Sequence, residues 1–307
     1  MTMLWLYIAI SCYLLFSAVF LIDKHLLAGP IGNPRVLVFY VGMLGVFGLL
    51  LIPFGLLQNP GIAVLGLALA AGAVRVWATY LYFSALRKCE VSRVTTAIGA
   101  TQPIFSFLLA LALSGGQASL DYWELAAFTL LFIGSVVIVS EKSFLTFTTA
   151  RLSLAASFLF SLSFILSKLV YNQQPFLSGF VLMGFGSFLF SLSFLLFADV
   201  RKTLLGLLSP KARDKSSRSA ALFLLNQFLG ASAFILQNYA IFLAPLAFVA
   251  VINALAGVQY AFLFVLTIII STYFPRIIKE KITPAIVGQK LIAIAFILAG
   301  LYIIAIK

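Results

Sequence analysis

The chain has 307 residues, of which 63% are hydrophobic and only 9% are charged, and its net charge is +12. A soluble domain carries about 25% charged residues, so this composition excludes a water-soluble globular fold and predicts a polytopic membrane protein. The excess of Lys and Arg does not indicate nucleic-acid binding, because basic residues beside membrane spans are normally retained on the cytoplasmic side and face anionic lipid.

Apolar segments of about 20 residues, the length that crosses the hydrocarbon core of a bilayer, recur along the whole chain. They predict an all-α protein with ten membrane-spanning helices at 3–22, 35–57, 62–86, 91–113, 122–140, 150–170, 176–198, 219–242, 246–272 and 285–306. Most connections are short and carry turn residues. The polar segment 199–219 is the long exception, and a basic loop is expected there.

Basic residues are distributed unevenly between these connections. Sixteen of the twenty Lys and Arg residues fall in the connections after the odd-numbered spans. The connections after the even-numbered spans hold none, apart from Lys168 at the end of the sixth span. The positive-inside rule therefore predicts a multi-pass protein of the plasma or inner membrane, with the odd-numbered connections in the cytoplasm and both termini outside.

The chain also repeats itself at a distance of about half its length. Three pairs of segments align in the same order: 16–24 with 160–168, 82–111 with 239–268, and Gly134 with Gly300. They predict two five-helix units, residues 1–141 and 150–307. Because five is odd, the second unit must enter the membrane inverted relative to the first. Inverted repeats are typical of secondary transporters, which bind substrate near the midplane between the units.

The last segment of the second unit, EKITPAIVGQKLIAIAFILAGLYII (280–304), contains an acidic residue, a Thr and two Gly residues at Glu280, Thr283, Gly288 and Gly300. In the first unit Gly134 matches, whereas LSGGQASLDYW stands where the acidic residue would fall. In these features the chain resembles the EamA-type, ten-helix branch of the drug/metabolite transporter superfamily. The resemblance implies transport of small metabolites, amino acids or drugs, often outward. It also implies cytoplasmic termini, in conflict with the charge distribution.

Arg75 is the one formal charge near the middle of a predicted span. It lies about twelve residues, or ~18 Å at 1.5 Å per residue, from either end, which disfavours snorkelling to the interface. Two readings stay open: a structural partner for polar groups of a neighbouring helix, or a residue that faces a water-filled cavity and attracts an anionic substrate. Thr79 and Tyr82 follow on the same helical face and share the substrate-binding prediction.

Polar side chains line three further predicted spans and are candidate substrate ligands, although small and amide residues also serve helix packing. These candidates are Thr95, Gln102, Asn226, Gln237, Asn253 and Gln259. Gln102 and Gln259 coincide under the repeat, which favours a paired site. Pro103 frees a backbone carbonyl one turn earlier and is a candidate hinge. Lys24 and Lys168 also coincide, either as interfacial anchors or as gate residues.

Several chemistries are missing from the sequence. All eight Asp and Glu residues lie at span ends or in loops, so no mid-membrane carboxylate is available for proton-coupled export of cationic drugs. No catalytic set, metal site, cofactor site or Walker-type loop is found, so neither an enzyme nor an ATP-driven pump is expected. The predicted function is a secondary transporter, an exporter or exchanger of a small neutral, zwitterionic or anionic metabolite by alternating access. The alternative is a flippase or carrier for a lipid-linked or phosphorylated anion.

Overall fold

A computed structural model describes residues 3–27, 33–54, 57–88, 91–117, 120–139, 147–207, 217–273 and 284–306. Every regular element within these ranges is helical, which confirms the all-α prediction. Five helices are long and apolar enough to cross a membrane: Ile62–Leu86, Phe147–Tyr171, Phe176–Leu196, Phe248–Leu266 and Val287–Ala305. The helices also carry large apolar side chains on their outer faces, among them Ile62, Leu108, Phe228 and Leu298, and together these features suggest a membrane-embedded protein.

In chain order the helices are α1 (Leu4–Leu27), α2 (Pro34–Met43), the 3₁₀ helix η1 (Leu44–Phe54), α3 (Ile62–Leu86), α4 (Val91–Leu113), α5 (Tyr122–Val139), α6 (Phe147–Tyr171), α7 (Phe176–Leu192), the 3₁₀ helix η2 (Ser193–Leu196), α8 (Ala198–Leu207), α9 (Ser217–Leu243), α10 (Phe248–Ala254), α11 (Ala256–Tyr273) and α12 (Pro284–Ala305). The bounds predicted for the third and fourth spans agree with α3 and α4 to the residue. The second, seventh and ninth predicted spans are each divided into two helices.

The division between α10 and α11 falls at Leu255. Its backbone N–H bonds the carbonyls of both Val251 and Ile252, at 3.0 and 3.1 Å, so the helix tightens there. The hydroxyl of Ser135 on α5 donates to the Ala254 carbonyl at 2.8 Å, which gives that carbonyl a partner from outside its own helix.

The first part of segment 199–219, expected to be a loop, is the helix α8. Val200 and Leu204 lie one turn apart and pack against Val36, Val38 and Phe194. Their i, i+4 spacing gives α8 an apolar face, and burying that face stabilises a helix that its overall polarity does not predict.

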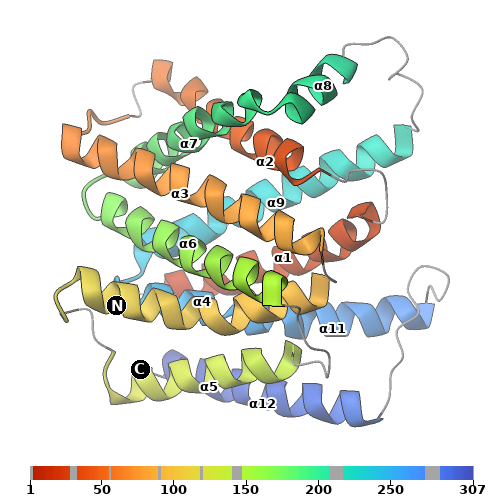
Figure 1. Ribbon diagram of the computed structural model, residues 1–307. Coiled ribbons are helices and arrows are strands. Elements are labelled where there is room, and N and C mark those ends of the chain that lie inside the picture. The colour runs from red at the N-terminus through yellow and green to blue at the C-terminus, as the bar shows by residue number, and fades with distance from the viewer. Residues whose placement is uncertain are drawn as a thin grey trace.

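The helices lie side by side, and the two ends of the chain lie at the same side of the bundle, on the left in Figure 1. Helix α6 packs extensively against α3 and α4, and α1 packs in the same way against α9 and α11. Under the sequence repeat α6 corresponds to α1, α3 to α9, and α4 to α10 and α11 together. The first helix of each half thus packs on the same two helices of the other half.

The contact between α5 and α12 shows the same equivalence between counterpart positions of the repeat, here at single residues. A Cβ atom on Gly134 would lie 2.7 Å from Cγ1 of Ile297, and one on Gly300 would lie 2.8 Å from Cγ of Leu131. Gly134 corresponds to Gly300, and Leu131 corresponds to Ile297, at the same shift of 166 residues. Each helix therefore offers the other the same surface, as in a two-fold symmetric interface.

Not all packing follows this exchange. Helix α3 packs against α7, and α5 packs against α10 and α11. The corresponding pairs in the repeat are α9 with α2, and α12 with α4. Within the described ranges neither of these pairs makes a comparable contact, so the packing of these helices differs from that of their counterparts in the sequence repeat.

Small residues allow several helices to approach one another closely. A Cβ on Gly45 of η1 would collide with the backbone of Gly184 on α7, so η1 and α7 lie in close backbone contact there. On α6, the Ser157 hydroxyl accepts a hydrogen bond from Thr101 at 2.8 Å, and the Ser161 hydroxyl donates to the Gln102 carbonyl at 2.9 Å. These bonds join α6 to α4, as small and hydroxyl side chains commonly do between membrane helices.

Candidate functional site

Arg75 points from α3 towards α9. Its guanidinium carbon lies 3.1 Å from the centroid of the Phe234 ring, which is a cation–π contact. Tyr171, the last residue of α6, is close enough to interact with it electrostatically. Within the described part of the chain, no hydrogen bond or ion pair holds the guanidinium, and the one salt bridge found there involves other residues. Among the described residues, Arg75 is therefore a partly buried cation that has an aromatic neighbour but no counter-ion.

Tyr171 is itself held by α9. Its hydroxyl donates to Oδ1 of Asn238 at 3.1 Å, and Nδ2 of Asn238 donates to the Phe234 carbonyl at 3.0 Å. Tyr171 and Asn238 are both buried. We call Arg75, Tyr171, Phe234 and Asn238 the arginine site. It is built where α3 of the first half meets α6 and α9 of the second half.

The two residues predicted to share the face of Arg75 make other contacts. The Thr79 hydroxyl donates to the Arg75 carbonyl at 2.9 Å, within its own helix. The Tyr82 ring packs at 6.2 Å from the ring of Phe160 on α6. The described contacts do not bring either side chain to the guanidinium.

Two of the predicted amide ligands belong to a second buried polar group, the Tyr13 cluster. Nδ2 of Asn253 donates to the Ser106 hydroxyl at 2.6 Å, and Nε2 of Gln237 lies 3.5 Å from the Tyr13 hydroxyl. Tyr13 in turn donates to the Ile252 carbonyl at 2.7 Å. These bonds connect α1, α4, α9 and α10, so the Tyr13 cluster joins helices from both repeat units of the sequence.

The remaining predicted ligands are dispersed. Gln102 and Gln259 are both partly buried, and no hydrogen bond joins them within the described ranges. Pro103 is buried in α4, which continues through it without interruption. Asn226 is buried on α9. Thr95 lies on α4, but its side chain is outside the described residues.

Lys168, the predicted gate or anchor on α6, is buried. Its Nζ donates to the Phe242 carbonyl at 2.8 Å, one residue before α9 ends. A cation at that position interacts favourably with the C-terminal end of the helix dipole, so Lys168 joins α6 to the end of α9. Lys24, its counterpart in the repeat, lies on α1 with its side chain outside the described residues.

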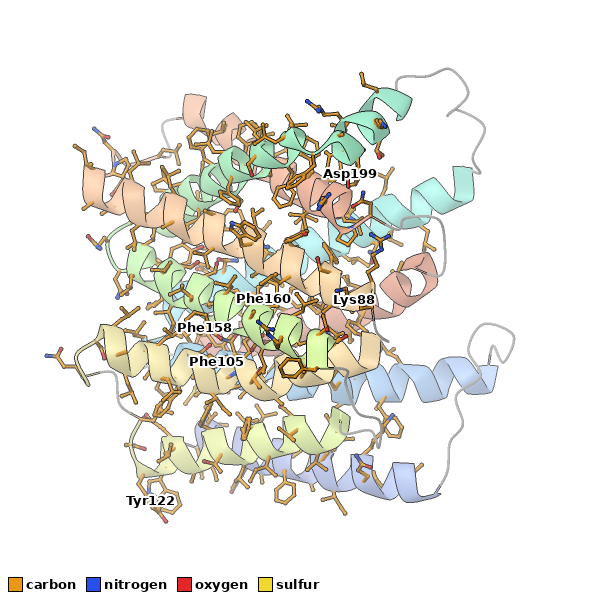
Figure 2. All side chains as sticks on the ribbon, viewed as in Figure 1. Lys88, Phe105, Tyr122, Phe158, Phe160 and Asp199 are labelled. Carbon is orange, nitrogen blue, oxygen red and sulfur yellow. The ribbon has the colours of Figure 1, made fainter. Side chains whose placement is uncertain are left out.

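A pocket of about 350 Å³ opens between α2, α3, α6 and α8, and we call it the α2–α8 pocket. Its polar lining is formed by Asn33, Arg35, Tyr80, Arg87, Lys88 and Asp199. Figure 2 shows the labelled Lys88 and Asp199 towards the same side of the bundle, away from Tyr122 at the start of α5. This set could not be recognised from the sequence, because its cations belong to separate connections of the chain and only the fold brings them together.

Asp199 holds the two sides of this pocket together. Its Oδ2 accepts a hydrogen bond from Nδ2 of Asn33 at 2.8 Å and pairs with Nη1 of Arg35 at 3.3 Å. The hydrogen bond from Asn33, followed by the attraction of the Arg35 guanidinium, lowers the pKa of the Asp199 carboxyl below its ordinary value of 3.8. We call this contact between α8 and the start of α2 the Asp199 latch.

The pKa shift sets the pH range in which the latch stabilises the protein. A carboxyl whose pKa is lower in the folded state contributes stability above its unfolded pKa and loses that contribution as the pH falls through the folded value. We therefore expect the difference in melting temperature between the wild type and Asp199→Asn to stay constant from about pH 5 to about pH 8 and to shrink only below about pH 4. Melting curves of both proteins in one detergent would check this, and a difference that shrinks between pH 8 and pH 5 would contradict it.

Comparisons with known proteins bear on the fold alone. No family model matches the chain, and no curated protein matches it. A solved structure described only as "Crystal structure of protein" is similar to it, with a TM-score of 0.64 and 18% sequence identity. The similarity covers 97% of this chain and 96% of the other. The whole helical arrangement is thus shared with a known structure, so no large part of the chain lies outside one fold.

Proposed function

We propose that the protein is an integral-membrane secondary transporter of a small zwitterionic or anionic metabolite, and that Arg75 binds the anionic group. The uncompensated charge of Arg75 carries this proposal. A cation inside a membrane protein is costly and is normally paired within the protein, yet the described residues give Arg75 only the Phe234 ring and Tyr171. A substrate carboxylate or phosphate would supply the missing counter-ion.

The position of the arginine site supports the same function. Its residues come from α3 of one half and from α6 and α9 of the other. Substrate sites of inverted-repeat transporters lie at this boundary between the repeats, near the membrane midplane. We propose ten membrane crossings in two inverted five-helix halves, residues 1–141 and 150–307. The exchanged contacts of Gly134 and Gly300 support a two-fold relation between those halves.

The asymmetric packing supports alternating access. A protein built from an inverted repeat can adopt two conformations. In the second conformation, each half makes the contacts that the other half makes in the first. Here α3 packs against α7, whereas α9 and α2, the counterpart pair, are not comparably joined within the described ranges. We interpret the structure as one of two end states and expect the contact between α9 and α2 to form in the other. This interpretation agrees with the resemblance to EamA-type transporters.

We propose that the side of the bundle bearing Arg87, Lys88, Arg201 and Lys202 faces the cytoplasm. In a variant that lacks its native cysteines, Gln117→Cys is then expected to react with an impermeant maleimide added to intact cells, whereas Lys202→Cys reacts only after the cells are opened. Both positions are exposed. The reverse labelling pattern would place the termini in the cytoplasm and overturn the predicted orientation.

The function is tested by comparing metabolites in the medium of cells that overexpress the wild type with those of cells carrying an empty vector. We expect one or a few anionic or zwitterionic metabolites to accumulate outside the cells that overexpress the protein. Radiolabelled counterflow in proteoliposomes would then show that the purified protein suffices. Export of a quaternary ammonium dye, without export of any such metabolite, would refute the proposal, because Arg75 repels a permanent cation.

A further inference from the structure

We propose that the α2–α8 pocket is a binding site for a phosphoryl group, separate from the arginine site, and that the bound group displaces Asp199 from Arg35. The pocket opens beside Tyr80, about 7.5 Å further along α3 than Arg75 at 1.5 Å per residue. Arg75 does not line it. The proposal does not depend on transport and stands or falls on binding alone.

The charge of the pocket matches a dianion. Three cations, Arg35, Arg87 and Lys88, face one carboxylate, Asp199, which leaves a formal charge of +2. Within the described ranges, Arg87 and Lys88 have no carboxylate partner. A phosphomonoester carries about −1.5 to −2 charge near neutral pH and offers three acceptor oxygens, so it would neutralise the pocket. A single carboxylate would leave half of the charge uncompensated.

The donors of the pocket are arranged for an oxyanion. The N-terminus of α2 lies in the lining, where Asn33 is the N-cap and Pro34 the first helical residue. Helix N-termini attract anions through their dipole. The Arg35 guanidinium also lies 4.2 Å from the centroid of the Phe197 ring, which orients it. Arginine in a fixed orientation binds phosphate through two parallel hydrogen bonds.

Asp199 occupies the position that such an oxyanion would take. Its carboxylate already accepts hydrogen bonds from Asn33 and pairs with Arg35, the donors nearest the end of α2. A phosphoryl group with more charge and more acceptor atoms would compete for both donors. Because Asp199 lies on α8, losing this competition would break the polar contact between α8 and the start of α2, while the apolar contacts of Val200 and Leu204 would remain. The Asp199 latch is therefore an internal competitor for the site.

This competition gives the proposal an unusual signature: removing a charged residue of the site should tighten binding. We expect purified full-length protein to bind inorganic phosphate saturably in isothermal titration at low salt. Asp199→Asn should lower the phosphate Kd by about tenfold, and Arg87→Gln should raise it by about tenfold, since a charge-assisted hydrogen bond contributes that much. Lys202→Gln, which removes an exposed cation of α8 outside the pocket, should leave the Kd unchanged.

The phosphoryl group could come from a soluble molecule or from a lipid headgroup, and a second titration separates these sources. Protein in phosphatidylcholine nanodiscs, with and without phosphatidic acid, is titrated with inorganic phosphate. If phosphatidic acid blocks phosphate binding in the wild type but not in Arg87→Gln, a headgroup occupies the site. If phosphate binds equally in both nanodiscs, the ligand is soluble. Either result supports the phosphoryl site.

The proposal is overturned if phosphate does not bind and phosphatidic acid has no effect that depends on Arg87. It is also overturned if Asp199→Asn weakens binding, or if Lys202→Gln weakens it as much as Arg87→Gln, because binding would then follow net charge alone. Should Asp199→Asn fail to fold, Arg87→Gln still tests the site, since the Arg87 side chain is exposed and takes no part in the latch. Arg75→Ala should bind phosphate as the wild type does, which keeps this result separate from that of the transport assay.

Discussion

Replacing Arg75 with Ala is expected to reduce counterflow of the exported metabolite by about 30- to 1,000-fold, because truncating one partner of a desolvated charge pair costs about 2–4 kcal/mol. Arg75→Lys should retain part of the activity. Lysine keeps the positive charge but loses the planar group that stacks on Phe234. The measurement is the initial rate of counterflow in proteoliposomes, normalised to protein that elutes as a single folded species.

Lys168→Met is the matched control for Arg75→Ala. It removes another buried cation, but one whose Nζ is bonded to the Phe242 carbonyl. We expect this variant to lose thermal stability and to keep its transport rate once the folded fraction is taken into account. If Arg75→Ala behaves like Lys168→Met, with lower stability and unchanged transport per folded molecule, then Arg75 is a structural residue and does not bind substrate.

The second large effect concerns the contact between α5 and α12. Gly300→Ala is expected to lower the free energy of unfolding by about 1–3 kcal/mol, the usual cost of overpacking, because its Cβ would lie 2.9 Å from the Ala127 carbonyl oxygen as well as against Leu131. A backbone carbonyl cannot move aside as a side chain can. Gly134→Ala meets the Ala293 carbonyl oxygen at the same distance and should be destabilised to a similar degree.

Gly288→Ala, on the same helix as Gly300, is the control. A Cβ there would meet nothing within 4 Å, so alanine should be neutral or should stabilise α12 by up to about 1 kcal/mol through its higher helix propensity. Melting temperatures in one detergent would compare the three variants. A Gly300→Ala protein as stable as Gly288→Ala would show that α5 and α12 do not meet as described, and unequal losses for Gly134→Ala and Gly300→Ala would refute the two-fold relation between these contacts.

The fold could be predicted where it depends on local composition. The ends of α3 follow from the turn residues before Ile62 and the basic residues after Leu86. The break at Leu255 could not be predicted, because no Pro or Gly interrupts 248–255 and the hydroxyl that bonds its carbonyl comes from α5. Helix α8 could not be predicted, because its apolar face stabilises the helix only when it is buried against Val36 and Phe194.

The candidate site could be predicted only in part. Arg75 stands out by its charge alone, whatever surrounds it. Phe234, Tyr171 and Asn238 could not be assigned to it, because their contacts depend on how α3, α6 and α9 are placed against each other. Asn238 directly follows Gln237, and successive helical residues point about 100° apart. The side chains of Gln237 and Asn238 therefore face different neighbours, and the sequence does not show that Asn238 is the one that reaches Tyr171.

The self-exchange between α5 and α12 also bears on how the two halves recognise each other. Each of these two helices carries a glycine and, one turn away, a branched side chain that packs against the glycine of the other helix. Two identical subunits form such an interface when they are related by a two-fold axis, and here both sides belong to one polypeptide. The peptide link between the halves then adds effective concentration rather than specificity. The interface therefore contains the same contact twice, once at Gly134 with Ile297 and once at Gly300 with Leu131. A substitution at one of these contacts leaves the other in place.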